Sequence, residues 1–212
     1  MRKITKGESA DYSGATLQIG RFRLFTQPMQ SNIEIYIGAM GESNLALAGK
    51  ICEGAIVVLY PMSKLAECLQ KVNRDAGGRK RTVFAYLPLR VTSSEKEERI
   101  AREQLSKYIA FYVSSMGKYY VRNLSKLGFQ NEAEKIIEAH TVSSKDSASA
   151  VTEDFLEQFC LIGSPRKVLE RIASIPEGIH PVFALGASTP QDGTESARSL
   201  RELSVALGPT NK

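Results

Sequence analysis

The sequence is short of the side chains that most often bind metals or act as nucleophiles. It has no tryptophan, two histidines and three cysteines among 212 residues. Cys52, Cys68 and Cys160 are widely spaced and no CxxC pair occurs, so neither a zinc site nor a redox disulfide is predicted. An odd number of cysteines without a secretory signal favours reduced thiols and a cytoplasmic location.

Long apolar runs and a strong excess of one charge are also missing. No segment is long and apolar enough to span a bilayer, so no membrane association is predicted. The formal net charge is +5, and the basic run Arg79-Lys80-Arg81 is best interpreted as a solvated loop that leads into a strand. Because no basic stripe with interleaved aromatic side chains occurs, nucleic acid is not an expected partner.

Recognisable catalytic motifs are absent as well. The sequence contains no HExxH, GxSxG or phosphate-loop pattern. His140 falls at the end of a predicted helix and His180 at the start of a predicted strand, and neither place favours catalysis. No pair of carboxylates follows the predicted strands, so acid–base hydrolysis has no support.

What the sequence does contain is an alternation of apolar strands and amphipathic helices. With 42% hydrophobic and 24% charged residues, it can form one sizeable core. A small hairpin around Gly20 is predicted within a lead-in of residues 1–31. Four main strands are predicted, each followed by helix; they begin at Ile33, Ala55, Thr82 and His180. The fold class is therefore α/β, with half of the eight strands of a (β/α)8 barrel.

Several helix boundaries carry strong local signals. Ser94, Thr152 and Ser164 are predicted N-caps, and Ser94 is followed by Glu97 in a capping box. The last helix is predicted over 195–207, after a loop of small residues over 187–194. Its apolar positions are expected to face inward: Ala197, Leu200, Leu203 and Leu207.

The stretch from Ile33 to Gly49 organises the rest of the chain. It begins as a buried strand, turns at Met40-Gly41 and continues as a short helix. The amide groups at such a helix start suit an anion such as a phosphate. The predicted phosphate-binding residues are those of the turn: Ala39, Met40, Gly41, Glu42, Ser43 and Asn44. An ordinary capped helix start explains the same pattern, and both interpretations stay open.

Two further segments at the carboxyl ends of predicted strands, 59–61 and 185–188, are candidate site segments together with this turn. Because the carboxyl ends of parallel strands share one edge of a sheet, the three segments are expected to converge. None of them carries a strong acid, base or nucleophile. That composition favours a binding site for a cofactor with its own reactivity. The predicted helix start at Gly163-Ser164-Pro165-Arg166 could also hold an anion, but an ordinary helix cap is the better interpretation.

The order of these segments resembles the luciferase-like flavin and deazaflavin oxidoreductase family. That family includes alkanal monooxygenases of the bacterial luciferase type and archaeal methylene-tetrahydromethanopterin reductases. The run from Ile35 to Gly49 looks like the family's fifth strand and turn, and Gly54-Ala55-Ile56 like its sixth strand. The segment from Ile162 to Val168 is similar to a late helix start of the family.

The resemblance implies a TIM barrel that binds FMN or coenzyme F-420 at the carboxyl ends of its strands, with the cofactor phosphate at the turn over 39–44. It also implies that the family's first four strands are absent. The expected domain is thus a single half-barrel over 1–212, with four βα units over 32–212. We expect self-association, or a separate chain that supplies the missing half, as well as a small-molecule substrate.

Two functions follow from this resemblance. The first is an oxidoreductase of the monooxygenase or F-420-dependent reductase class, acting as an oligomer or as half of a split enzyme. The alternative is a non-catalytic, oligomeric half-barrel protein that binds a phosphate-bearing ligand or none. No catalytic residue can be assigned from the sequence, and no metal is expected.

Overall fold

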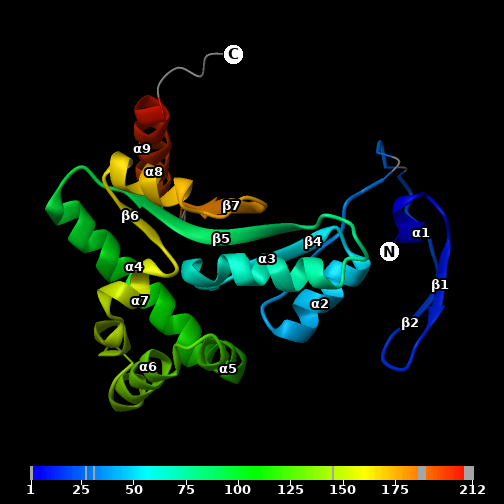
Figure 1. Cartoon of the computed structure of the whole chain (residues 1–212), viewed down its shortest axis with the longest axis horizontal. Helices are drawn as coiled ribbons and strands as arrows, with labels where there is room; N and C mark the ends of the chain where they lie inside the picture. The colour runs from blue at the N-terminus through cyan, green and yellow to red at the C-terminus, as the bar shows by residue number, and fades with distance from the viewer. Residues whose placement is uncertain (1, 27, 31, 145, 186–189, 208–212) are drawn as a thin grey trace. The chain divides into compact units, whose positions relative to one another are not determined.

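The computed structural model describes residues 2–26, 28–30, 32–144, 146–185 and 190–207 (Figure 1). Contacts between residues divide the chain into two units, 1–35 and 36–212. Whether residues 1–212 form one domain, with a lead-in over 1–31, stays a prediction. The two units are described separately below.

The first unit contains a short helix and a two-stranded ribbon. Helix α1 is Arg2–Thr5, and strands β1 (Ala10–Ser13) and β2 (Gln18–Phe22) pair antiparallel. The amide of Gly14 donates to the carbonyl of Leu17 at 2.9 Å and closes the turn between them. The predicted small hairpin or ribbon is present, but it is not centred on Gly20, because Gly20 lies inside β2 and the turn falls at 14–17.

The second unit is built on a parallel sheet, which confirms the predicted α/β class. Strands β3 (Tyr36–Gly38), β4 (Gly54–Val58) and β5 (Thr82–Val91) lie side by side, and β7 (Ile179–Ala184) pairs with β5. Figure 1 shows β5 running between β4 and β7. A fifth strand, β6 (Leu161–Gly163), pairs with the end of β5 and was not predicted. Three buried residues are too short a pattern to reveal a strand.

Two helices cover one face of this sheet. Helix α2 (Glu42–Ile51) packs on β4, and α3 (Leu65–Arg74), preceded by a 3-10 turn η1 (Met62–Lys64), packs on β5. The two helices touch closely at Gly49, where an added Cβ would lie 1.9 Å from the carbonyl oxygen of Val72. Beneath them, the sheet residues Ala55, Val57, Val83 and Ala85 are all buried.

The opposite face of the sheet is only partly covered. In the parallel register, Gly38, Ile56, Phe84 and His180 form one row across the four strands. Ile56 is 38% exposed, and Val182, two residues beyond His180, is 40% exposed. We call this the inner face of the sheet, since α2 and α3 lie on the other side.

A group of helices follows β5 and contains the largest part of the remaining core. It consists of α4 (Glu95–Ser115), α5 (Lys118–Lys126), α6 (Gln130–Val142), the 3-10 turn η2 (Asp146–Ala150) and α7 (Glu153–Glu157). Gly117, at φ +88°, separates α4 from α5. Helices α8 (Pro165–Ala173) and α9 (Pro190–Leu207) flank β7 in the chain.

The predicted N-caps at Ser94, Thr152 and Ser164 are confirmed. The predicted start of the last helix is wrong. Ser94, Thr152 and Ser164 each accept a hydrogen bond from an amide three residues later. Helix α9 begins at Pro190, so the predicted loop over 187–194 is wrong from that residue on; residues 186–189 lie outside the described residues. Leu203 is buried, but Leu200 and Leu207 are at least half exposed, because only one edge of α9 touches the core.

Candidate functional site

The predicted phosphate turn directly follows β3. Ala39 and Met40 are buried, and Gly41 is the N-cap of α2 with an extended backbone. The amides of Asn44 and Leu45 both donate to the Gly41 carbonyl at 3.0 Å. Glu42, Ser43 and Asn44 form the first turn of α2, and no side chain caps this helix start, so the interpretation as an ordinary side-chain-capped helix is wrong here. The first-turn amides of Glu42 and Ser43 have no acceptor within the helix.

A pocket of about 310 Å³ opens beside this turn. Its walls come from the turn, from the inner face of β3 and β4, and from α5; they are Gly38, Ala39, Met40, Asn44, Ile56, Val58, Tyr119 and Tyr120. Three of the six predicted site residues therefore line one pocket. At Gly38 no heavy atom lies within 4 Å of an ideal Cβ position, so the strand end itself is open.

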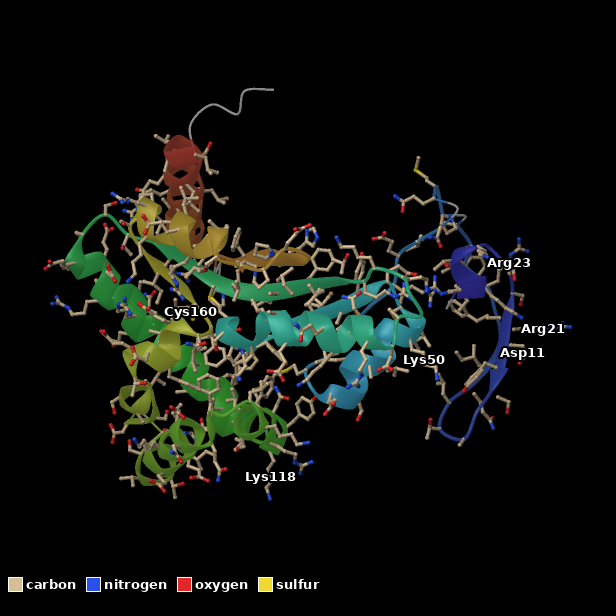
Figure 2. All side chains as sticks on the ribbon, in the orientation of Figure 1. Asp11, Arg21, Arg23, Lys50, Lys118 and Cys160 are labelled. Carbon is tan, nitrogen blue, oxygen red and sulfur yellow. The ribbon has the colours of Figure 1, made fainter. Side chains whose placement is uncertain are left out.

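Tyr119 is the residue that sequence reasoning missed at this site. Its phenol oxygen accepts a hydrogen bond from the Gly41 amide at 3.1 Å. Lys118, which precedes it and is labelled in Figure 2, opens α5 and points away from the body of the unit. The sequence Gly117-Lys118-Tyr119-Tyr120 is typical of a helix start. Nothing in this local pattern indicates a contact with the distant turn at 39–44.

The second pocket tyrosine belongs to a chain of aromatic rings. The ring of Tyr120 lies 5.3 Å from that of Tyr112, which lies 4.8 Å from that of Tyr108. Burial, followed by the nearby phenols of Tyr112 and Tyr119, raises the pKa of Tyr120. Burial, followed by its hydrogen bond with Tyr112, raises the pKa of Tyr108. The phenols of Tyr108 and Tyr120 are therefore neutral near pH 7 and act as hydrogen-bonding groups rather than as bases.

The predicted segment at the end of β4 is buried and strained. Leu59 has a φ of +52°, an unusual value for a side chain of this size. Tyr60 is 3% exposed, and burial, followed by the neighbouring Cys68, raises its pKa. Burial likewise raises the pKa of the Cys68 thiol to about 12. Neither group is a base or a nucleophile at neutral pH.

The third predicted strand end is described only at Leu185; Gly186, Ala187 and Ser188 lie outside the described residues. The guanidinium of Arg90, near the end of β5, donates a hydrogen bond to the Leu185 carbonyl. This contact joins the ends of β5 and β7. Sequence reasoning did not single out Arg90, because an arginine inside an apolar strand gives no indication of its partner.

The remaining candidates have ordinary structural roles. Ser164 accepts from the Lys167 amide at 3.4 Å, so the start of α8 is an ordinary capped helix. Burial raises the pKa of Cys160 to about 12; Figure 2 labels this residue beside β6. His180 lies near the start of β7, with its ring 5.6 Å from that of Phe84. Across the described ranges, no three His, Cys, Asp or Glu residues are grouped so that they could hold a metal ion, and no helix is long and apolar enough to cross a membrane.

The chain was compared with known proteins. The model of the luciferase-like monooxygenase family matches residues 1–179. Two curated relatives are both named 5,10-methylenetetrahydromethanopterin reductase. That of Archaeoglobus fulgidus is 27% identical over 87% of this chain and 57% of its own length. That of Methanopyrus kandleri is 29% identical over 80% of this chain and 49% of its own length. The chain thus spans about half the length of these relatives.

Solved structures support the same fold. The coenzyme F-420-dependent tetrahydromethanopterin reductase from Methanopyrus kandleri has a TM-score of 0.74 at 24% identity, with 95% of this chain and 59% of that chain covered. The oxygenating constituent of 3,6-diketocamphane monooxygenase from Pseudomonas putida, in complex with FMN, has a TM-score of 0.57 at 19% identity, over 95% and 59% of the two chains. At these identities the likeness concerns the fold alone. Because the family model matches most of the chain, the protein belongs to the luciferase-like monooxygenase family.

Proposed function

We propose that the chain is part of a flavin- or deazaflavin-dependent oxidoreductase and binds FMN or coenzyme F-420 through the phosphate of that cofactor. The binding residues are those of the turn at 39–44. The observation that carries the proposal is the uncapped start of α2, whose free amides lie beside a pocket of about 310 Å³.

The residues present fit a phosphate-bearing cofactor. Gly38 has no heavy atom within 4 Å of an ideal Cβ position, so a ligand can approach the backbone there, whereas at Gly41 the Tyr119 phenol oxygen lies 3.1 Å from that position. Glu42 adds a negative charge to the first turn, but Arg74 lies 3.6 Å from its carboxylate and offsets that charge. The side chain of Asn44 lines the pocket and can offer an amide to the ligand.

When bound, either cofactor supplies hydride transfer, and FMN can also react with oxygen. The chain's own residues hold the ligand and shape its surroundings. The amides of the turn bind the phosphate, while Ile56 and Val58 form an apolar wall. The phenols of Tyr119 and Tyr120 can donate hydrogen bonds to the ligand.

We further propose that the four strands β3, β4, β5 and β7 act as one half of a barrel. Their inner face is partly exposed, and the chain covers about half of its curated relatives. A second copy of the chain, or a separate chain with the other strands, would close the barrel over this face. The relatives named above are reductases and monooxygenases, and a reaction of that class is the proposed activity.

One observation favours the alternative of a non-catalytic protein that binds a phosphate-bearing ligand or none. Apart from the two phenols, the described residues that line the pocket include no acid, base or nucleophile. A closed barrel without bound cofactor would support this alternative.

The test is a titration of the purified chain with FMN, riboflavin and F-420, together with its absorption spectrum and solution mass. We expect FMN or F-420 to bind saturably, and FMN to bind more tightly than riboflavin, which lacks the phosphate. Gly41→Asp places a carboxylate in the turn and should abolish that difference. Gly20→Asp makes the same change in the first unit, where an added Cβ meets no atom within 4 Å, and serves as the matched control. Equal affinities for FMN and riboflavin in the unaltered chain would exclude the phosphate site.

A further inference from the structure

A second and larger cavity lies among the helices that follow β5. Its volume is about 600 Å³, within the range of small-molecule pockets. One wall is formed by α4, and the other by the end of α6 and by η2. None of its lining residues belongs to the pocket beside Gly41.

The α4 wall is a regular stripe of side chains. Glu103, Lys107 and Phe111 follow one another at intervals of four residues, so they share one face of the helix. Tyr108 and Tyr112, which belong to the aromatic chain of the first site, lie on a different face. The two stripes meet at one point, because the Phe111 ring lies edge to face against that of Tyr112, 5.9 Å away.

The charges in this cavity cancel. The Lys107 ammonium lies 2.7 Å from the Glu103 carboxylate, and both side chains are more than half exposed. His140 is the other titratable residue among those that line the cavity. Since the two charges neutralise each other, the cavity does not select strongly for an ionic ligand.

Uncharged hydrogen-bonding groups dominate the rest of the lining. The Ser147 hydroxyl donates to the Ser144 carbonyl at 3.0 Å, and that of Ser114 to the Ala110 carbonyl at 2.8 Å. Both hydroxyl oxygens keep the capacity to accept a further hydrogen bond.

His140 is the unexplained group of this cavity. Its Nδ1 atom is buried and has no hydrogen-bond partner among the described residues. Buried polar atoms are nearly always paired, so the hydrogen-bonding capacity of this imidazole is not used up by the described residues.

Phe111 supplies a flat apolar surface in this otherwise polar lining. Its side chain is 53% exposed. A planar ring can stack on it, with its polar edge directed to the hydroxyls and the imidazole.

We propose that this cavity binds a neutral heteroaromatic molecule of nucleoside size, stacked on Phe111 and hydrogen-bonded by His140 and the serine hydroxyls. The site is independent of the cofactor site, and its ligand needs no phosphate.

The two histidines of the sequence make a direct test possible. Adenosine is titrated into protein labelled at histidine, and both imidazole signals are followed by NMR. The signal of His140 should shift saturably at millimolar adenosine or below. His180 lies on β7, outside this cavity, and its signal should stay in place.

Two variants complete the experiment, one on α4 and one at its C-cap, Met116. Phe111→Ala removes the stacking surface and should weaken adenosine binding about fivefold. Met116→Ala, which alters a similarly exposed apolar residue outside the cavity, should leave adenosine binding unchanged. The proposal is overturned if His140 does not respond to adenosine, if both histidines respond alike, or if Phe111→Ala binds adenosine as the unaltered chain does.

Discussion

The amide of Gly41 donates a hydrogen bond to the phenol oxygen of Tyr119 across 3.1 Å, although 78 positions separate the two residues. This bond uses an amide of the turn that we propose as the phosphate site. A phosphate oxygen bound to the same N–H must displace the phenol. The two partners therefore compete.

The competition gives a prediction for Tyr119→Phe. The variant loses the phenol oxygen but keeps the ring, so the Gly41 amide is free for the ligand. We expect FMN to bind about threefold more tightly, in line with the modest net value of one exposed hydrogen bond. Calorimetric titration measures the change, and riboflavin should show none. Tyr120→Phe is the matched control, since Tyr120 lines the same pocket. Weaker FMN binding by Tyr119→Phe would mean that the phenol contacts the phosphate instead.

The contact between α2 and α3 predicts the effect of a methyl group at Gly49. An added Cβ would lie 1.9 Å from the Val72 carbonyl oxygen, so the helices must separate. We expect Gly49→Ala to lower the free energy of unfolding by about 3 kcal/mol. Urea denaturation measures this loss. The same change at Gly20, which meets no atom within 4 Å, should be nearly neutral, and an equal effect at both glycines would contradict the packing argument.

Glu97 gives a prediction of pH dependence. Its carboxylate accepts a hydrogen bond from the Ser93 amide at 2.8 Å and pairs with Arg198 of α9 at 3.1 Å. The Ser93 bond, followed by Arg198, holds the pKa of Glu97 below its usual value of 4.5. A carboxyl group with a lowered pKa in the folded state stabilises the fold above its unfolded pKa, and this contribution is lost as the pH falls below about 4.5.

The measurement is the urea midpoint of the unaltered chain and of Glu97→Gln between pH 7 and pH 3. The difference between the two should be largest near neutral pH and should shrink as the solution is acidified. Glu138→Gln, which removes an exposed carboxylate from α6, serves as a control. A difference between Glu97→Gln and the unaltered chain that does not change with pH would show that the carboxylate has no such role.

The inner face of the sheet yields a prediction about assembly. If a second half-barrel covers this face, Val182 becomes buried even though it is 40% exposed in the single chain. Val182→Lys would then place an unpaired charge in the closed barrel and dissociate the assembly. Sedimentation of the two proteins measures the change in mass. Leu200→Lys, on the half-exposed side of α9, should leave the mass unchanged. A mass that is the same for Val182→Lys and the unaltered chain would place the interface elsewhere.

The features that the sequence by itself determined are those set by short-range rules. Strands β4, β5 and β7 follow from apolar runs of strand length in the sequence, although the inner face of the sheet stays partly exposed in the single chain. Ser94, Thr152 and Ser164 were identified as caps because a cap bonds an amide only three residues away. The turn at 39–44 was recognised as a helix start for the same local reason.

Which residues contact the turn at 39–44 was decided by the tertiary structure alone. Tyr119 reaches Gly41 through the arrangement of α4 and α5, which no local pattern encodes. Strand β6 forms because the end of β5 offers it a partner, and its three residues carry too little pattern to be found beforehand. Leu200 and Leu207 stay exposed because the core reaches only one edge of α9. Local patterns fix which segments become helices or strands, but contacts between distant segments, which depend on packing, form the pocket.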